Sequence, residues 1–234
     1  MICIGTSGYS YPEWKGSFYP ADLPAAKMLS YYSSHFPTVE INNTFYRMPT
    51  EKVLLGWADV TPSHFKLTLK SPRRITHDSG LRNCEEYVGA FCQMAGTLGN
   101  KLGVLLFQCP PSLKKDVGLL ESFLSALPPG VRAAFEFRHP SWHADDVYAA
   151  LNLKNSALCI ADSEKLSTPV TATADFGYLR LRDEGYTESD IKRWATIIEE
   201  NQAHWGDTFV YFKHEEEGKG PEFAKKLQKL LNVS

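Results

Sequence analysis

The stretch Phe65-Lys66-Leu67-Thr68-Leu69-Lys70 alternates apolar side chains with polar or ionisable ones, and the polar ones fall at even positions. The same parity recurs in VEIN at 39–42, in AFEFR at 134–138 and in YLRLR at 178–182. Successive side chains of a strand point to opposite faces, so each segment predicts a strand with one apolar and one charged face.

The segments between these strands have the spacing of helices, which favours a parallel sheet. Parallel strands are normally covered on both faces and consist of continuous apolar runs, so charged residues on one covered face need a special location. A closed barrel provides it, because apolar side chains face the surrounding helices while polar ones point into the lumen. The pattern therefore favours a barrel over an open doubly wound sheet.

The same residue patterns divide the whole chain into alternating strands and helices. We expect eight strands, near residues 2–5, 38–42, 65–70, 102–108, 132–138, 156–162, 176–182 and 208–214. Helical patterns fill most gaps, but residues 163–175 contain a Thr-Pro pair and a Thr/Ala-rich run and predict an irregular connection. The length of 234 residues suits one TIM-like (β/α)8 barrel, so we expect a single domain over residues 1–234.

Net charge, cysteine content and hydropathy limit the classes of function that this protein can have. The net charge of −2 removes the simplest argument for a nucleic-acid or membrane-surface protein, although it allows a local basic site. The five cysteines are odd in number, widely spaced and without a C-x-x-C pair, which indicates reduced thiols. With a strand expected from Ile2 and no apolar run of membrane-spanning length, we expect a cytoplasmic protein without a membrane partner.

Several motifs carry a resemblance to a known family. They are IGTSGYSYPEWKG at 4–16, VEINNTFYR at 39–47, FQCPPS at 107–112, FEFRHPSW at 135–142, YLRLR at 178–182 and VYF at 210–212. In this order they resemble domain-of-unknown-function family 72 (DUF72, YecE-like) over nearly the whole chain. The resemblance implies a TIM-like barrel and no particular reaction. The last strand of that family usually ends in two asparagines and an aspartate, where this chain has Lys213-His214-Glu215.

The working face of such a barrel lies at the carboxyl ends of its strands. We predict catalytic roles there for Glu40, Glu136, Asp162 and His139. Ligand-binding roles are predicted for Asn42, Asn43, Tyr46, Lys70, Gln108, Arg138, Arg180, Arg182 and Lys213. The alternation also places Lys66 in the lumen. The lumen would then hold six cations, Lys66, Lys70, Arg138, Arg180, Arg182 and Lys213, and three anions, Glu40, Glu136 and Asp162.

This excess of cations indicates an anionic ligand, since buried unpaired charges are costly. The leading hypothesis is an enzyme, a hydrolase or lyase, acting on a phosphate- or carboxylate-bearing small molecule. In it Arg138, Arg182 and Lys70 hold the anion, and Glu40 or Glu136 moves a proton. A Schiff base on Lys70 or Lys213 is a further option.

Four alternatives stay open. The charges could form a structural ion-pair network, for example between Glu136 and Arg180. The protein could be a nucleic-acid-binding or DNA-repair-like barrel that uses the rim aromatics Tyr9, Tyr11, Trp14, Tyr46, Trp142 and Tyr186. It could also be a non-catalytic ligand-binding module. A metal site built from the carboxylates with His77, His139 or His214 lacks an H-x-H or H-E-x-x-H signature, so we name no metal ligand and leave the cofactor open.

Overall fold

The computed structural model describes residues 1–163, 166–183, 185–214 and 218–233. Within these residues, eight parallel strands form a closed ring, in which β1 pairs with both β2 and β9 and β5 pairs with both β4 and β6. The strands are β1 (Ile2–Ser7), β2 (Thr38–Ile41), β3 (Lys66–Lys70), β4 (Leu102–Gln108), β5 (Ala133–Glu136), β6 (Ala157–Ser163), β8 (Phe176–Leu181) and β9 (Asp207–Phe212). All eight predicted strands and the TIM-like (β/α)8 fold are thereby confirmed.

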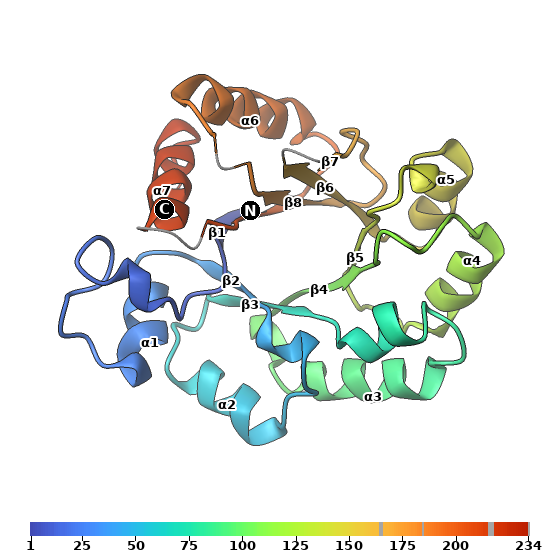
Figure 1. Ribbon diagram of the computed structural model, residues 1–234, viewed down its shortest axis with the longest axis horizontal. Helices are drawn as coiled ribbons and strands as arrows, with labels where there is room; N and C mark the ends of the chain where they lie inside the picture. The colour runs from blue at the N-terminus through green and yellow to red at the C-terminus, as the bar shows by residue number, and fades with distance from the viewer. Residues whose placement is uncertain (164–165, 184, 215–217, 234) are drawn as a thin grey trace.

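Helices surround this ring (Figure 1). They are α1 (Met28–Ser33), α2 (Glu51–Asp59), α3 (Glu85–Gly96), α4 (Val117–Ala126), α5 (Asp145–Leu153), α6 (Glu188–Asn201) and α7 (Lys219–Leu230). Side chains fix several starts: Thr50 caps α2, Asp116 caps α4, and Thr187 with Asp190 forms a capping box on α6. No helix of the described residues is long and apolar enough to cross a membrane.

The connection between β6 and β8 is irregular, as predicted. In the described part of residues 163–175 the chain forms no helix, and β7 (Leu166–Ser167) runs antiparallel to the end of β6. This irregular segment lies between α5 and α6, where other βα units of the barrel carry a helix (Figure 1).

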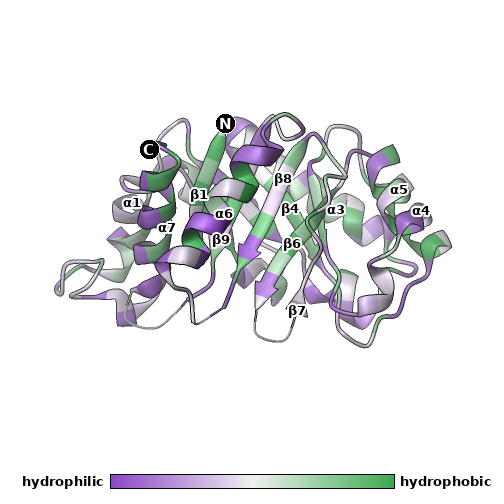
Figure 2. Ribbon diagram, turned by 90° about the horizontal axis from the view of Figure 1, so that it is seen from above, coloured by the Kyte–Doolittle hydropathy of each residue, from purple (hydrophilic) through white to green (hydrophobic). Residues whose placement is uncertain are grey.

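Two apolar clusters separate the inside of the barrel from its outside. The outer cluster joins strand residues such as Val39, Leu69 and Phe135 to the helices, whose apolar sides face the barrel (Figure 2). The inner cluster fills the lower lumen with Cys3, Val104, Leu106, Ala134, Ala157, Cys159, Ala161, Ala174, Phe176, Tyr178, Phe209 and Tyr211. The lumen is thus a packed core at the amino ends and becomes polar only toward the carboxyl ends.

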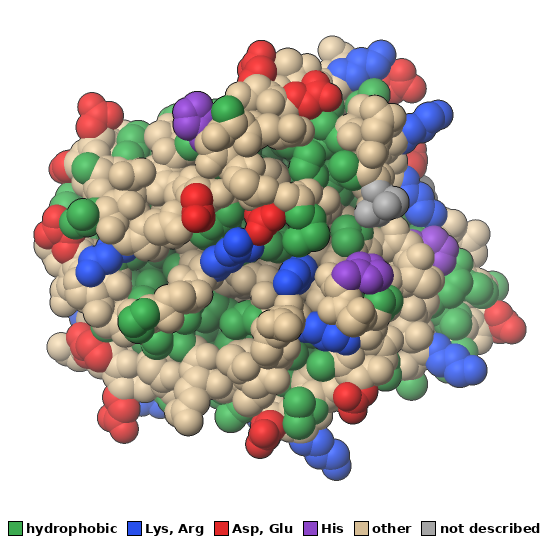
Figure 3. Space-filling view, turned by 180° about the vertical axis from the view of Figure 1, so that it is seen from behind, with side chains coloured by type: hydrophobic (Ala, Val, Ile, Leu, Met, Phe, Trp, Pro, Cys, Tyr) green, Lys and Arg blue, Asp and Glu red, His purple; other side chains and the backbone are tan. Residues whose placement is uncertain are grey.

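The amino ends of the strands carry charges of both signs. The face seen in Figure 3 shows positive and negative side chains next to each other near its centre. At this end Asp207 on β9 pairs with Arg132 at 2.7 Å and with the amino terminus of Met1 at 3.0 Å. Lys66 begins β3 here, opposite Thr38, and its Nζ donates to the backbone carbonyl of Asn100. Lys66 therefore has the predicted parity, but it lies at the amino end of the barrel, away from the residues predicted for the site.

Candidate functional site

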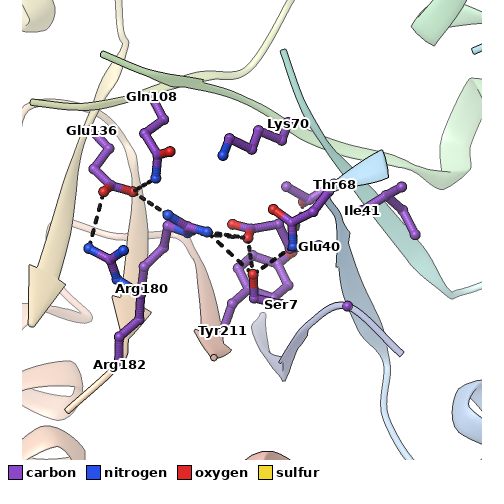
Figure 4. A network of polar contacts seen from close by, with 12 residues as sticks. Ser7, Glu40, Ile41, Thr68, Lys70, Gln108, Glu136, Arg180, Arg182 and Tyr211 are labelled. Carbon is purple, nitrogen blue, oxygen red and sulfur yellow. Dashed lines mark hydrogen bonds and ion pairs between the residues drawn. The ribbon is translucent and has the colours of Figure 1, made fainter. Parts of the chain in front are cut away.

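A pocket of about 230 Å³ opens at the carboxyl ends of the strands. Its lining comes from several βα connections and from the upper lumen: Tyr11, Asn42, Phe45, Tyr46, Lys70, Gln108, Arg138, Arg180, Arg182 and Lys213. Eight of these ten residues are among the predicted ligand-binding side chains. Strands β2, β3, β4, β5 and β8 converge on the same cavity because their even-numbered side chains point inward at this level, as the close-up in Figure 4 shows for Lys70, Gln108 and Arg180.

Arg180 on β8 forms the centre of the site, and its side chain is only 2% exposed. Its guanidinium bridges two carboxylates from opposite parts of the barrel, donating from Nη2 to Glu40 at 2.8 Å and from Nη1 to Glu136 (Figure 4). Neither carboxylate is exposed at all. One buried cation therefore holds two buried anions, an arrangement that is stable only when every partner is present.

Glu40 on β2 uses both of its oxygens. Oε1 accepts from Ser7 Oγ at 2.5 Å and from Arg180, while Oε2 accepts from the Tyr178 hydroxyl at 2.5 Å. Ser7 Oγ in turn accepts from Asn42 Nδ2 at 2.9 Å, which connects the network to the pocket wall. Burial alone would raise the pKa of Glu40, but Arg180 and the two hydroxyl donors outweigh it and keep the pKa below its ordinary value.

Glu136 on β5 is surrounded by donors in the same way. Oε2 accepts from Gln108 Nε2 at 2.9 Å and from Arg180, and Oε1 accepts from Arg138 Nε at 3.0 Å and Arg182 Nη2 at 3.2 Å. Burial opposes ionisation, yet the three arginines lower the pKa of Glu136 far below its usual range. Glu136 is therefore a permanent anion whose oxygens are occupied, which suits it to positioning arginines better than to accepting protons.

Arg138 and Arg182 stand side by side because both guanidinium groups donate to the same oxygen of Glu136. Their side chains are 30% and 15% exposed, so they form the part of the network that faces the pocket. Among the described residues, Arg138 donates only through Nε, and both of its Nη groups are left for another acceptor. Burial and the charges of Arg180 and Arg138 lower the pKa of Arg182, which shows how crowded the cations are.

Lys70 ends β3 and lies apart from this network, as Figure 4 shows. Its ammonium lies 4.0 Å from the centre of the Phe45 ring, a cation–π contact. Burial and the charge of Arg180 lower the pKa of Lys70 to about 7, although Glu40 and Glu136 act in the opposite direction. The lowered pKa brings the uncharged amine, the nucleophilic form of lysine, within reach near neutral pH.

The comparisons with known proteins agree with this architecture. A sequence model of the family described as "Protein of unknown function DUF72" matches residues 3–234. The chain belongs to the DUF72 family. A crystal structure of a DUF72 protein from Thermotoga maritima is similar, with a TM-score of 0.88 and 28% identity over 99% of both chains.

Two curated relatives are also similar to this DUF72 chain. The UPF0759 protein YunF of Bacillus subtilis is 25% identical and is matched over all of this chain and 95% of its own length. The UPF0759 protein YecE of Escherichia coli K12 is 31% identical over 145 residues. That second match covers 62% of this chain and spans about half, 51%, of YecE.

Asp162 is the clearest departure from the predicted site of this DUF72 barrel. On β6 the lumen receives Ala157, Cys159 and Ala161, so Asp162 points outward with Leu158 and Ile160. Its carboxylate accepts from the Tyr186 hydroxyl at 3.0 Å and from Arg193 on α6 at 3.4 Å. The prediction that Asp162 lies in the lumen is wrong, because it has the parity of the apolar residues that face the helices.

Two further predicted residues lie outside the pocket lining. His139 follows β5, and its Nδ1 accepts from Ser141 N at 3.2 Å, which caps the short turn Pro140–Trp142. Asn43 is exposed and begins the turn Asn43–Phe45, which carries Phe45 and then Tyr46 to the pocket. The turns thus use His139 and Asn43 to shape the backbone near the site.

The rim aromatics divide into two groups. Trp14 and Trp142 are 1% and 0% exposed, and they pack the loops over the barrel. Tyr46 is 78% exposed at the pocket, while Tyr11 donates its hydroxyl to the carbonyl of Ser7 at 2.8 Å and lines the wall. Only Tyr11 and Tyr46 of the predicted aromatics therefore border the pocket that the structure describes.

The described residues contain no cluster of three or more histidine, cysteine, aspartate or glutamate side chains that could hold a metal. His77 packs edge-on against Phe45 with ring centres 4.9 Å apart, and His214 binds the carbonyl of Asp183 at 2.7 Å. The histidines considered as ligands are thus distributed around the barrel. Glu215 of the Lys213-His214-Glu215 segment lies outside the described residues.

Sequence reasoning missed two residues that matter for the site. Tyr178 holds Glu40, and its position two residues before Arg180 on the same strand face was a usable signal. Phe45 forms the aromatic support under Lys70, but it lies in a turn where no periodicity marks an inward side chain. The bond of Ser7 to Glu40 depends on the register between β1 and β2, which the sequence does not show.

A stability prediction follows from the unpaired position of Lys70. Because its pKa of about 7 lies below the value near 10.4 of an unfolded lysine, the unfolded chain binds more protons between these pH values. The contribution of Lys70 to wild-type stability should therefore rise from pH 7 to pH 10. We expect Lys70→Met to be more stable than wild type in urea unfolding at pH 7, with an advantage that shrinks toward pH 10. A constant difference over this range would contradict the shifted titration.

Proposed function

We propose that this DUF72 protein is an enzyme whose pocket binds a small anionic molecule bearing a phosphate or carboxylate. The observation that supports it most strongly is the positive charge of the side chains that line the pocket. Five lining residues are cationic side chains, namely Lys70, Arg138, Arg180, Arg182 and Lys213, and no carboxylate lines the pocket among the described residues. The two carboxylates of the network are fully buried behind this surface.

Charge counting supports the same conclusion. Even without Lys213, the four lining cations Lys70, Arg138, Arg180 and Arg182 share two carboxylates of the described network, Glu40 and Glu136, so four minus two leaves an excess of up to two positive charges around one small cavity. Burial lowers the pKa values of Lys70 and Arg182, and the neighbouring arginine charges add a repulsion in the same direction. A bound oxyanion would relieve it and would suit paired arginines, whose planar donors match phosphate and carboxylate geometry.

The pocket volume limits the ligand. At about 230 Å³ the cavity is below the range of roughly 300–1,000 Å³ that is typical of ligand pockets. A metabolite of a few carbon atoms with one anionic group fits this space, whereas a duplex or a large cofactor would extend far beyond it. Arg138 and Arg182 hold the anion in this proposal, and Lys70 lies beside the remainder of the molecule.

The roles of the carboxylates differ from a simple acid–base pair. Glu40 and Glu136 accept hydrogen bonds on all four oxygens and have lowered pKa values, so they hold Arg180, Arg138 and Arg182 in place. In this proposal the buried anions fix the arginines, and the chemistry belongs to groups that line the cavity. A perturbed lysine in a polar cleft is a sign of such a reactive group.

Calorimetric titration with inorganic phosphate, pyruvate and small phosphorylated sugars tests the proposal. We expect at least one anion to bind at a single site, with an affinity that falls as salt is added. Lys66→Ala is the matched control, because it removes a lysine from the same strand at the far end of the barrel and should leave binding unchanged. Equal binding of neutral analogues, or equal loss in Lys66→Ala, would contradict an anion site in this pocket.

A second candidate is binding of single-stranded nucleic acid, which the exposed ring of Tyr46 at a cationic pocket favours. A terminal phosphate would enter the pocket while a base stacks on Tyr46. This candidate predicts salt-dependent binding of short oligonucleotides that Tyr46→Ala weakens clearly. Binding of small anions without measurable oligonucleotide binding would eliminate it and leave the small-molecule proposal.

A further inference from the structure

Lys70 differs from other partly buried lysines of this barrel in having no acceptor. Lys101 Nζ donates to the carbonyls of Ala58 and Thr61, and Lys66 Nζ donates to the carbonyl of Asn100. Within the described residues, Lys70 Nζ has neither a hydrogen bond nor an ion pair, and its one contact is with the face of Phe45. A buried ammonium is normally paired, so this position favours the neutral amine.

The arginines around Lys70 favour the neutral amine as well. Arg180 and Arg138 repel an ammonium, while the attraction of Glu40 and Glu136 is largely used by the arginines that bind them. His77, which also packs against Phe45, has a pKa lowered by burial and by the charge of Lys70. Lys70 is therefore a neutral amine for much of the time at the wall of a cavity that it shares with two arginines.

We infer that Lys70 is the nucleophile of this pocket and forms an imine with the carbonyl carbon of a small anionic aldehyde or ketone, such as an oxo acid or a sugar phosphate. The inference rests on the proposed function and deepens it, because Arg138 and Arg182 would hold the phosphate or carboxylate of the same molecule. Its geometric basis is the placement of an acceptor-free amine and a pair of guanidinium groups in the lining of one cavity.

The reaction balances without a cofactor. The nitrogen lone pair of Lys70 attacks the carbonyl carbon, and the carbon–oxygen π electrons move to oxygen, which takes up the proton released by nitrogen. The resulting carbinolamine then loses its hydroxyl group and the second nitrogen proton as one molecule of water, leaving a carbon–nitrogen double bond. A protonated imine accepts electrons from an adjacent bond, so this pocket would favour lyase or aldol-type chemistry over hydrolysis.

Borohydride trapping tests the inference on the intact wild-type protein. Dihydroxyacetone phosphate and pyruvate are incubated with it separately, sodium borohydride adds hydrogen across the carbon–nitrogen double bond, and peptide mass spectrometry locates the adduct. We expect the adduct on Lys70 well before the exposed Lys229, with a rate that rises from pH 6 to pH 8 and falls when inorganic phosphate competes. Lys70→Arg, which keeps the charge, should lose the adduct, and Lys66→Arg should keep it.

The outcomes separate this inference from the proposed function. If neither probe is trapped at Lys70 while inorganic phosphate still binds, the imine inference is wrong and the anion pocket stands. If labelling is equal on Lys70 and on exposed lysines, the inference is also wrong. If Lys70 is trapped preferentially but phosphate neither binds nor competes, the nucleophile stands and the anion pocket is wrong.

Discussion

Replacing Arg180 with methionine is expected to lower the free energy of unfolding by about 3–5 kcal/mol, the cost typical of breaking a buried ion pair. The guanidinium is 2% exposed and is the shared partner of Glu40 and Glu136. Methionine fills part of the space but leaves both carboxylates without their central cation. The loss is larger than for a surface pair, because the two anions have no access to solvent.

Urea unfolding with a two-state fit measures this change. Arg193→Met is the matched control, since Arg193 pairs with Asp162 at 3.4 Å but is 51% exposed, and it should cost less than about 1 kcal/mol. Adding Glu40→Gln and Glu136→Gln to Arg180→Met should recover much of the loss, because neutral amides need no cation. A triple variant as unstable as the single one would show that packing, and not charge, makes Arg180 important.

The pH dependence of Arg180→Met has a defined sign. In wild type the pKa values of Glu40 and Glu136 lie below those of the unfolded chain, so their contribution is present above about pH 4.5 and declines as the pH falls below it. Without Arg180 the two carboxyls protonate more easily in the folded state. The stability curves of wild type and variant should therefore converge toward acid pH.

The double variant Arg138→Ala/Arg182→Ala is expected to reduce the affinity for inorganic phosphate by about 100-fold or more. Each charge-assisted hydrogen bond contributes about 1.5–3 kcal/mol, so losing two such donors has a large effect. Glu136 keeps Gln108 and Arg180 as donors in this variant, so the fold should persist.

Two other variants make this result specific. Arg138→Lys/Arg182→Lys keeps both charges but loses the planar fork, and we expect an intermediate affinity. Arg82→Ala removes an arginine that is 52% exposed and pairs with Asp116, and it should leave phosphate affinity unchanged. Equal affinity in wild type and in Arg138→Ala/Arg182→Ala would show that these arginines do not hold the anion.

The sequence predicted the lumen well where one strand face is charged. On β2, β3, β5 and β8 the parity of Glu40, Lys70, Glu136 and Arg180 is correct because the opposite parity is fully apolar. On β6 both faces are apolar or small, so the alternation could not show that Cys159 and Ala161, and not Leu158 and Ile160, face the lumen. The misplacement of Asp162 follows from this ambiguity.

The sequence also could not predict how far along the barrel axis each side chain lies, or which side chains bind one another. Lys66 and Lys70 have the same parity, but the pairing of Thr38 with Lys66 puts Lys66 at the amino end. Which side chain binds Glu136 depends on strands far apart in the chain, such as β4 and β8. Residue types alone therefore predicted carboxylates as proton carriers, whereas their contacts show that they bind arginines.

The central claim is that this cluster of cations binds an anion, and locating that anion tests it most directly. Crystals would be soaked in tungstate, a heavy phosphate analogue, at concentrations that compete with phosphate in solution, and anomalous scattering would locate the metal atom. We predict one strong peak between the guanidinium groups of Arg138 and Arg182, beside Lys70. An empty pocket at saturating tungstate, with peaks elsewhere on the surface, would contradict the account.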